Sequence, residues 1–451
     1  MIIHSPFTLK NLSWLVVLAL FLRFASELTA NLSYLLIAVY ALHGRTQAIQ
    51  ALALSWLFSM LNPSIAPDPS AAAVGRYLVI VAAAISVALR STGSTGRFSS
   101  SIVWETTLFL GLFMLIHSLL FSAVVDVSVL KVLSWTVVVL TLLSAWQGLA
   151  SSDCVALFDQ LLLWLIWLLL LSLPLLFIPS IGYLRNGTGF QGLLSHPQSF
   201  GPTVALVGAL VGGRAMVELR PAWRDIFLLG LCLVLIVLSE ARTAGLAMIL
   251  GLLISVLLSP TLAGVPRWRL LPGLRSPRFQ VVGLLAVAGM IMFGSLLSGT
   301  VTGFLYKRSD TTSLIDAFDA SRGEIIEKMI LNIQQNPWSG IGFGIASDPE
   351  SMDVQRDPVL DLPVSALVEK GVLPVAVVEE LGIFGALAVF GWFLFVFRRG
   401  AVSGVPKFAV LITLVLVNFG ESMFFSVSGM GMLLLILLTG AVTGRQRLKR
   451  H

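Results

Sequence analysis

Apolar residues run through this chain in long blocks, and polar residues gather in the short segments between them. Such blocks predict membrane-spanning helices, because about 20 apolar residues are needed to cross the hydrocarbon core of a bilayer. We expect candidate spans at 11–25, 28–43, 47–63, 76–90, 102–121, 129–147, 155–179, 197–213, 225–239, 241–260, 279–299, 377–397, 406–420 and 423–443. The pattern predicts an all-α, polytopic membrane protein with about 12–14 transmembrane helices and one long extracytoplasmic loop containing short helices.

The composition supports this fold class. Of the 451 residues, 57% are hydrophobic and only 12% are charged, and the mean hydropathy is +0.93. Soluble domains carry about 25% charged residues, so this chain lacks the charge to cover a water-exposed surface. The composition excludes most soluble enzymes, disordered proteins and nucleic-acid binders.

The basic residues predict the topology. Most Lys and Arg residues fall on one side of the expected spans when the N-terminus is placed in the cytoplasm. Short loops rich in Lys and Arg stay cytoplasmic, so we expect both termini inside, and the net charge of +6 is mainly a topology signal. We divide the chain into N-terminal transmembrane helices (1–179), central helices with a short outer loop (180–299), the long extracytoplasmic loop (300–376), and C-terminal helices with a basic cytoplasmic tail (377–451).

Several familiar motifs do not occur in the sequence. It has no Walker A, HExxH, GxSxG or DxD pattern, only five histidines, and two cysteines without metal-ligand spacing. We therefore expect no metal site and no ATP-driven mechanism.

The long loop contains a pattern typical of a helix start. Residues 321–324 form a capping box, an apolar face follows, and Pro337 ends the helix. Arg322 would then lie in the first turn, where backbone N–H groups and a guanidinium can together hold a phosphate. The alternative is an ion pair of Arg322 with Asp319 or Glu324. The glycine-rich run that follows, 338–344, reads first as a tight structural loop.

Arg242 lies between two apolar runs that have no linker, beside Glu240. A charged residue at a membrane boundary is costly unless it is paired or used. Arg242 therefore either pairs with Glu240 or meets a ligand together with the outer loop.

Two further segments offer titratable groups at span boundaries. His196 precedes Pro197 after the short outer loop that holds Arg185, so it either starts a helix or takes part in the chemistry. Glu379 and Glu380 stand at the start of a span, where they are either solvated or able to share a proton and act as a general base.

These segments together resemble the signature of the O-antigen ligase and O-antigen polymerase superfamily. The resemblance rests on Ser321–Glu324, Asn336–Gly344, Ser239–Thr243, Gly192 with His196–Gln198, and Glu380–Gly385. It covers about 180–400, and the earlier spans match only as hydrophobic helices.

The resemblance implies a lipid-donor membrane glycosyltransferase of surface polysaccharide biosynthesis. Members take a glycan from undecaprenyl diphosphate on the periplasmic face of the bacterial inner membrane. Ligases pass it to the lipid A–core of lipopolysaccharide, polymerases to a growing glycan, and others to a protein. The implied partners are this donor, a glycan, lipid or protein acceptor, and the surrounding membrane lipids, with no nucleic acid, cofactor or metal.

The resemblance also implies roles for particular residues. Arg242 and Arg322 would bind the diphosphate, with help from Lys370, Arg185 and His196. Many members carry His-Asn shortly before the closing Glu, where this chain has Glu369-Lys370-Gly371. The base that takes the acceptor proton would then be Glu380 or Glu369, and the chain is a ligase, a polymerase or another branch of the family.

A transporter or flippase for a lipid-linked or anionic solute is the second functional class. In that case Arg23, Glu105 and Asp159, which lie within apolar runs, would line the path. A transporter concentrates its functional charges at mid-membrane, whereas this chain concentrates them at the outer face.

Overall fold

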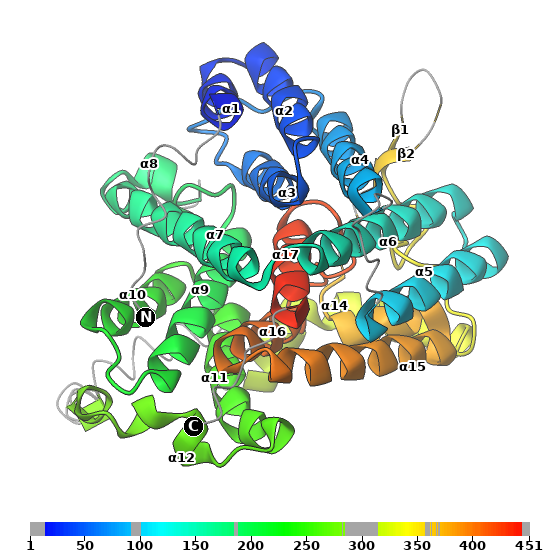
Figure 1. The fold of residues 1–451 in the computed structure, drawn as a ribbon. Coiled ribbons are helices and arrows are strands. Elements are labelled where there is room, and N and C mark those ends of the chain that lie inside the picture. The colour runs from blue at the N-terminus through cyan, green and yellow to red at the C-terminus, as the bar shows by residue number, and fades with distance from the viewer. Residues whose placement is uncertain are drawn as a thin grey trace.

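The computed structural model describes residues 14–91, 101–184, 188–281, 283–284, 314–356, 361, 363–366, 368 and 370–443. These residues form helices and one two-stranded hairpin (Figure 1). The chain is an all-α polytopic membrane protein, as the apolar pattern predicts.

The first half of the chain folds into consecutive helices. They are α1 (Trp14–Ala25), α2 (Glu27–Ala41), α3 (Arg45–Met60), α4 (Ala72–Ser91), α5 (Ile102–Phe121), α6 (Val125–Gln147), α7 (Ser151–Ser172), the 3-10 helix η2 (Leu173–Phe177) and α8 (Pro179–Gly182). The second half contains α9 (Pro197–Val217), α10 (Trp223–Leu238), α11 (Arg242–Ala263), α12 (Arg267–Leu270), η3 (Pro272–Arg275), α14 (Leu314–Gln335), β1 (Val354–Arg356), β2 (Pro363–Ala366), α15 (Leu373–Val402), α16 (Val405–Val417) and α17 (Met430–Thr443).

Each expected span except 279–299, which is described only to residue 284, overlaps a helix, but the span expected at 423–443 becomes helical only at Met430. Within the described part of the chain, seven helical segments are long and apolar enough to cross a membrane: α4, α5, α6, α7 with η2, α9, α11 and α15. The shorter apolar helices α1, α2, α16 and α17 accompany them.

Helices α9, α16 and α17 form the centre of the bundle (Figure 1). Most residues of each are buried, because other helices surround them on all sides. Small residues allow this close packing: Gly251 of α11, for example, lies directly against Thr413 of α16.

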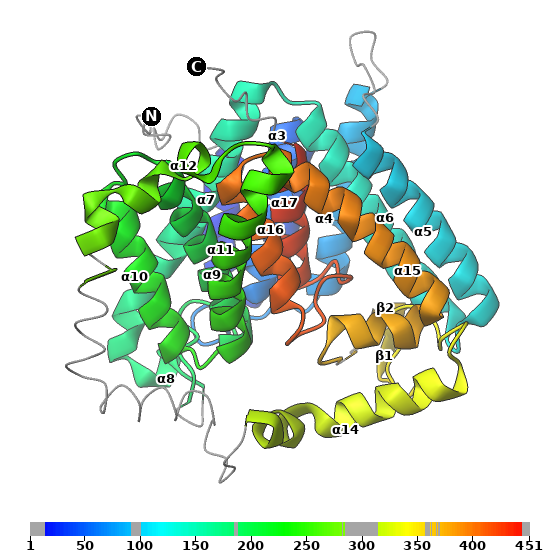
Figure 2. The same cartoon turned by 90° about the horizontal axis from the view of Figure 1, so that it is seen from below.

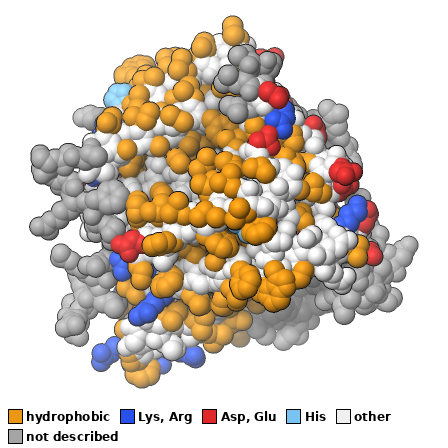
Figure 3. All heavy atoms as spheres, turned by 90° about the vertical axis from the view of Figure 1, so that its right-hand side faces the viewer, with side chains coloured by type: hydrophobic (Ala, Val, Ile, Leu, Met, Phe, Trp, Pro, Cys, Tyr) orange, Lys and Arg blue, Asp and Glu red, His pale blue; other side chains and the backbone are white. Residues whose placement is uncertain are grey.

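The outer helices present apolar side chains outward. Phe109 and Ile116 of α5, and Phe384, Leu387 and Phe390 of α15, are each more than half exposed. Figure 3 shows a mainly hydrophobic face with charged side chains toward its edges. A surface of this kind fits lipid rather than water.

Two ends of the bundle differ in their elements. Figure 2 shows α14, α8 and the β1–β2 hairpin at one end, which we name the α14 end, and α12 at the opposite end, which we name the α12 end. Arg267 and Arg269 of α12 and Arg275 of η3 are all at the α12 end. Helix α14 and the hairpin therefore lie at the opposite end of the bundle from the arginines of α12 and η3.

One local prediction is wrong. Helix α14 begins at Leu314 rather than at Ser321, so the described backbone places Arg322 inside the helix and not in its first turn. The reason is that Leu314 and Phe318 continue the apolar spacing of Ile325 and Met329 toward the N-terminus, which favours helix upstream of the capping-box pattern.

Candidate active site

The candidate site is built on a kink near the start of α15. Gly382 has φ 66° and ψ −175°, which divides α15 into two helical segments. Only glycine adopts this conformation without strain, and a Cβ at Gly382 would collide with the carbonyl of Trp338. The backbone conformation of the kink therefore requires the glycine of the Glu-x-Gly motif.

The glycine-rich run 338–344 wraps this kink and satisfies the backbone groups that it frees. The N–H of Ile341 donates to the carbonyl of Glu379 (2.9 Å), and the N–H of Gly342 donates to that of Glu380 (3.0 Å). The N–H of Ile383 donates to the carbonyl of Pro337 (2.9 Å). Two motifs that are far apart in sequence therefore form one backbone unit, which agrees with reading 338–344 as a structural loop.

Lys370 lies beside both carboxylates of α15. Its Nζ is 2.7 Å from Glu379 Oε2 and 3.2 Å from Glu380 Oε1. The Lys370 side chain is 1% exposed, that of Glu379 is 0% exposed and that of Glu380 is 10% exposed. The solvated alternative for the two glutamates is therefore wrong, because the wrapped loop and Lys370 shield them from solvent.

The two glutamates have different surroundings. Glu379 Oε1 accepts from Asn332 of α14 (2.7 Å), so both of its oxygens are engaged within the protein. Glu380 Oε2 accepts from the N–H of Gly344 (2.7 Å), and Glu380 also lines a cavity. Only Glu380 of this pair can meet a ligand there.

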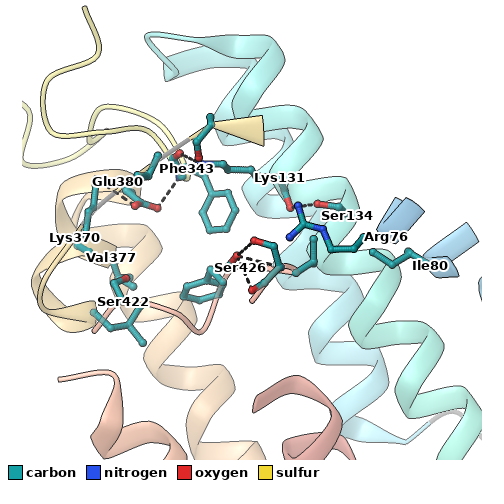
Figure 4. A pocket seen from close by; sticks show the side chains of 18 of the residues that line it. Arg76, Ile80, Lys131, Ser134, Phe343, Lys370, Val377, Glu380, Ser422 and Ser426 are labelled. Carbon is teal, nitrogen blue, oxygen red and sulfur yellow. Dashed lines mark hydrogen bonds and ion pairs between the residues drawn. The ribbon is translucent and has the colours of Figure 1, made fainter. Parts of the chain in front are cut away.

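This cavity, which we name the α14-end cavity, has a volume of about 260 Å³. Four charged side chains line it: Arg76 of α4, Lys131 of α6, Lys370 and Glu380. Figure 4 shows Lys370 and Glu380 on one side and Arg76 on the other. The described wall carries three cations and one carboxylate. With Glu379, which pairs with Lys370 behind the wall, the cluster keeps a net charge of +1, which favours an anionic ligand.

Sequence reasoning missed Arg76 and Lys131 as candidate site residues. Lys131 Nζ donates to the carbonyl of Gly344 (2.7 Å), so α6 is joined directly to the glycine loop. A signal was available, since both residues are among the few cations that the predicted topology leaves outside the cytoplasmic loops. Their convergence with Lys370 is a tertiary contact that no local pattern encodes.

The segment between α16 and α17 forms another wall of the α14-end cavity. Ser422, Ser426 and Ser428 line it. The N–H of Ser422 donates to the carbonyl of Lys370 (3.0 Å), which ties this segment to the charged cluster. Buried Asn418 holds the turn, because its Oδ1 accepts from the two backbone N–H groups of residues 423 and 424.

Arg242 and His196 lie at the starts of two neighbouring helices. Arg242 is the first residue of α11, and Thr243 beside it packs against Gly420 of the α16–α17 segment. His196 caps α9, where its Nδ1 accepts from the N–H of Gln198 (3.2 Å). Among the described residues that line the α14-end cavity, neither Arg242 nor His196 is present.

The structure describes the remaining candidate site residues only in part or not at all. Arg185 and Glu369 lie outside the described residues, and only the backbone of Arg322 is described. Their proposed contacts with substrate stay predictions.

The three charged residues within apolar runs have separate environments. Arg23 donates from Nε and Nη2 to the carbonyl of Phe58 (3.1 and 2.9 Å). Asp159 forms an ion pair with Arg214, and Glu105 is exposed in the first turn of α5. Arg23 and Asp159 thus hold helices together at different places.

Comparison with known families adds an independent finding. Residues 227–366 match the family model described as "O-Antigen ligase". A search of curated proteins finds no match. The matched segment includes α10, α11, α14 and the hairpin, and it supplies Phe343, Gly344 and Ala366 to the cavity wall. The match supports the resemblance seen in the motifs: residues 227–366 of this chain are similar to the O-antigen ligase family.

Proposed function

We propose that the protein is an inverting, metal-independent glycosyltransferase. It moves a glycan from undecaprenyl diphosphate to an acceptor glycan or lipid at the outer face of the bacterial inner membrane, in surface polysaccharide biosynthesis. The observation that carries this proposal is the α14-end cavity, in which Arg76, Lys131 and Lys370 face one carboxylate, Glu380.

The three cations suit a diphosphate leaving group. Negative charge grows on the diphosphate as the bond to the sugar breaks, and fixed cations in a shielded site stabilise that charge. Lys131 donates to the carbonyl of Gly344 beside Glu380, and Arg76 lies across the cavity from Lys370 and Glu380. A phosphate in the cavity would therefore have donors on two sides.

Arg242 and Arg322 complete the proposed diphosphate site, with weaker roles for Arg185 and His196. Arg242 fits because it begins α11, where the helix dipole favours an anion. Arg322 rests on the family resemblance and on its place in α14, because the first-turn argument no longer applies to it.

Glu380 is the proposed general base. An ionised carboxylate has about four lone-pair sites, and two contacts are made here, to Lys370 and to the N–H of Gly344. An acceptor hydroxyl can therefore still donate to Glu380. The hydroxyl oxygen attacks the anomeric carbon opposite the diphosphate, the bond to the diphosphate oxygen breaks with its electron pair, and Glu380 takes the proton. One displacement inverts the anomeric centre.

Glu369, outside the described residues, is the other proposed base.

The proposed topology places the α14 end outside the cytoplasm. Arg267, Arg269 and Arg275 then lie in the cytoplasm at the α12 end, as expected for short basic loops. Both termini are cytoplasmic in this arrangement.

A transport role has less support. Arg23 donates to the carbonyl of Phe58 and Asp159 pairs with Arg214, so both are engaged in contacts between segments of the bundle, and Glu105 is exposed.

The proposal is tested with purified protein, an undecaprenyl-diphosphate glycan and an acceptor, in the presence and absence of EDTA. We expect transfer with inverted configuration in both cases. Loss of transfer with EDTA would overturn metal independence, and retained configuration would overturn the single displacement.

Two variants test the proposed arginines in this assay. We expect Arg242→Gln and Arg322→Gln each to reduce turnover by about 10²–10³-fold, as for removal of one donor to a developing charge. Lys328→Gln is the matched control on α14, because exposed Lys328 pairs only with Glu324 on the surface in the described structure. Equal rates for wild type and Arg322→Gln would remove Arg322 from the mechanism.

A further inference from the structure

A second cavity lies between the ends of five helices and has a volume of about 290 Å³. We name it the α12-end cavity. Its lining consists of Ser101, Trp146, Gln147, Leu149, Ser151, Cys154, Val155, Arg399, Lys407, Val442 and Thr443.

The α12-end cavity is separate from the candidate active site. Helices α6 and α15 contribute to both cavities, but from opposite ends: Lys131 and Glu380 line the α14-end cavity, whereas Gln147 and Arg399 line this one. Along α6, the rise from residue 131 to residue 147 is about 24 Å at 1.5 Å per residue. That length is close to the thickness of a bilayer core, so the two cavities face opposite membrane surfaces.

Two cations line the α12-end cavity, and its described lining contains no carboxylate. Lys407 Nζ donates to the carbonyl of Gly440 (3.2 Å) and lies 4.7 Å from the centre of the Phe158 ring. Neither Lys407 nor Arg399 forms an ion pair with a described carboxylate, since nearby Asp159 is paired with Arg214. The two cations of the lining are therefore not held in a described ion pair, and the nearest carboxylates are Asp153, in the first turn of α7, and Asp159.

The segments next to Ser101 and Thr443 in the sequence add no acidic side chain. Residues 92–100, before Ser101, and residues 444–451, after Thr443, contain no Asp or Glu. Helices α7 and α16 also begin at this cavity, at Ser151 and Val405, and helix starts favour anions.

Trp146 provides an independent donor. It lines the cavity and is 1% exposed, and its Nε1–H has no hydrogen-bond acceptor among the described residues. Buried donors are normally paired, so Trp146 leaves an unsatisfied polar group in the wall that also holds the two cations.

We propose that the α12-end cavity binds the phosphate of an anionic phospholipid headgroup from the leaflet at that end. Basic pockets between transmembrane helices on the cytoplasmic side are suited to such headgroups. The lipid reaches the cavity from the side, because Val155 of α7 belongs to its lining and is 43% exposed on the apolar exterior.

The test measures the binding of phosphatidylglycerol, phosphatidylcholine and inorganic phosphate to the full chain in detergent. Native mass spectrometry reports the bound lipid, and the melting temperature reports stabilisation by ligand. We expect phosphatidylglycerol to bind and to raise the melting temperature, and phosphatidylcholine to do neither. Equal protection by inorganic phosphate would overturn the lipid as the source of the phosphate.

Variants locate the site. Arg399→Gln and Lys407→Gln should each weaken phosphatidylglycerol binding about ten-fold, because each removes one charge-assisted contact. Arg398→Gln is the matched control, since Arg398 is exposed, adjacent in sequence and outside the lining. Arg399 is only half buried, so we expect Arg399→Gln to fold. This variant therefore tests the site even when Lys407→Gln does not fold. Unchanged binding in Arg399→Gln would overturn the proposal.

Discussion

Replacing Lys370 by Met tests the charged cluster at the start of α15. The substitution keeps an unbranched side chain of similar length and removes the only cation within 4.0 Å of Glu379 and Glu380 among the described side chains. Two adjacent carboxylates then remain in a site where Lys370 and Glu379 are at most 1% exposed.

The expected cost is large because the ion pair is buried. Removing one partner of a buried pair typically costs about 3–5 kcal/mol, since the other charge stays desolvated and unpaired. This free energy corresponds to a change of about a hundred-fold to a few thousand-fold in the ratio of folded to unfolded protein. The two short contacts of Lys370, 2.7 and 3.2 Å, argue for the upper half of that range.

The assay is reversible unfolding of the purified protein in mixed detergent micelles, with tryptophan fluorescence as the signal. A second variant, Lys370→Met with Glu379→Gln, removes one carboxylate as well and keeps an oxygen that accepts from Asn332. We expect this double variant to recover a large part of the lost stability.

Two results would refute the reasoning. The first is a Lys370→Met variant as stable as wild type, which would mean that the carboxylates are not held by this lysine. The second is a double variant no more stable than the single one, which would assign the loss to packing rather than to charge.

Three further substitutions probe the same site. Gly382→Ala should destabilise the protein by at least about 1–2 kcal/mol, the cost of a left-handed non-glycine residue, because its Cβ also meets the carbonyl of Trp338; an unchanged melting temperature would contradict the kink. Lys131→Gln should raise the KM for the lipid-diphosphate donor about ten-fold through loss of one charge-assisted contact, and an unchanged KM would remove Lys131 from the donor site. Asn332→Ala should lower the rate of transfer by freeing Glu379 from α14, whereas a rate equal to wild type would show that this link does not position the cluster.

Much of the fold could be predicted from the sequence, because membrane spans are local features. The expected span at 102–121 coincides with α5, since a long apolar run follows a Ser101 cap. The start of α14 was missed because a local capping pattern at 321–324 competes with apolar spacing that continues upstream to Leu314. Local sequence signals thus predict the presence of a helix more reliably than they predict its first residue.

The site was predictable only in part. Glu380 could be found because it lies in a motif that resembles a known family, and Lys370 because it stands where many members of that family carry His-Asn. Arg76 and Lys131 could not, because they join the other two only through packing of α4 and α6 against the glycine loop and α15. The pairing of Glu379 with Asn332 is likewise a contact across 47 residues of chain.

The central claim is that the α14-end cavity is the site of glycan transfer. The most direct measurement is the initial rate of transfer from an undecaprenyl-diphosphate glycan by purified wild type, Arg76→Gln and the surface control Lys328→Gln. Arg76 lines the cavity and forms no ion pair with a described carboxylate, so its loss should spare the fold. We predict a rate at least about 10²-fold lower for Arg76→Gln at an unchanged melting temperature, with Lys328→Gln equal to wild type. An Arg76→Gln rate equal to that of wild type would contradict the claim.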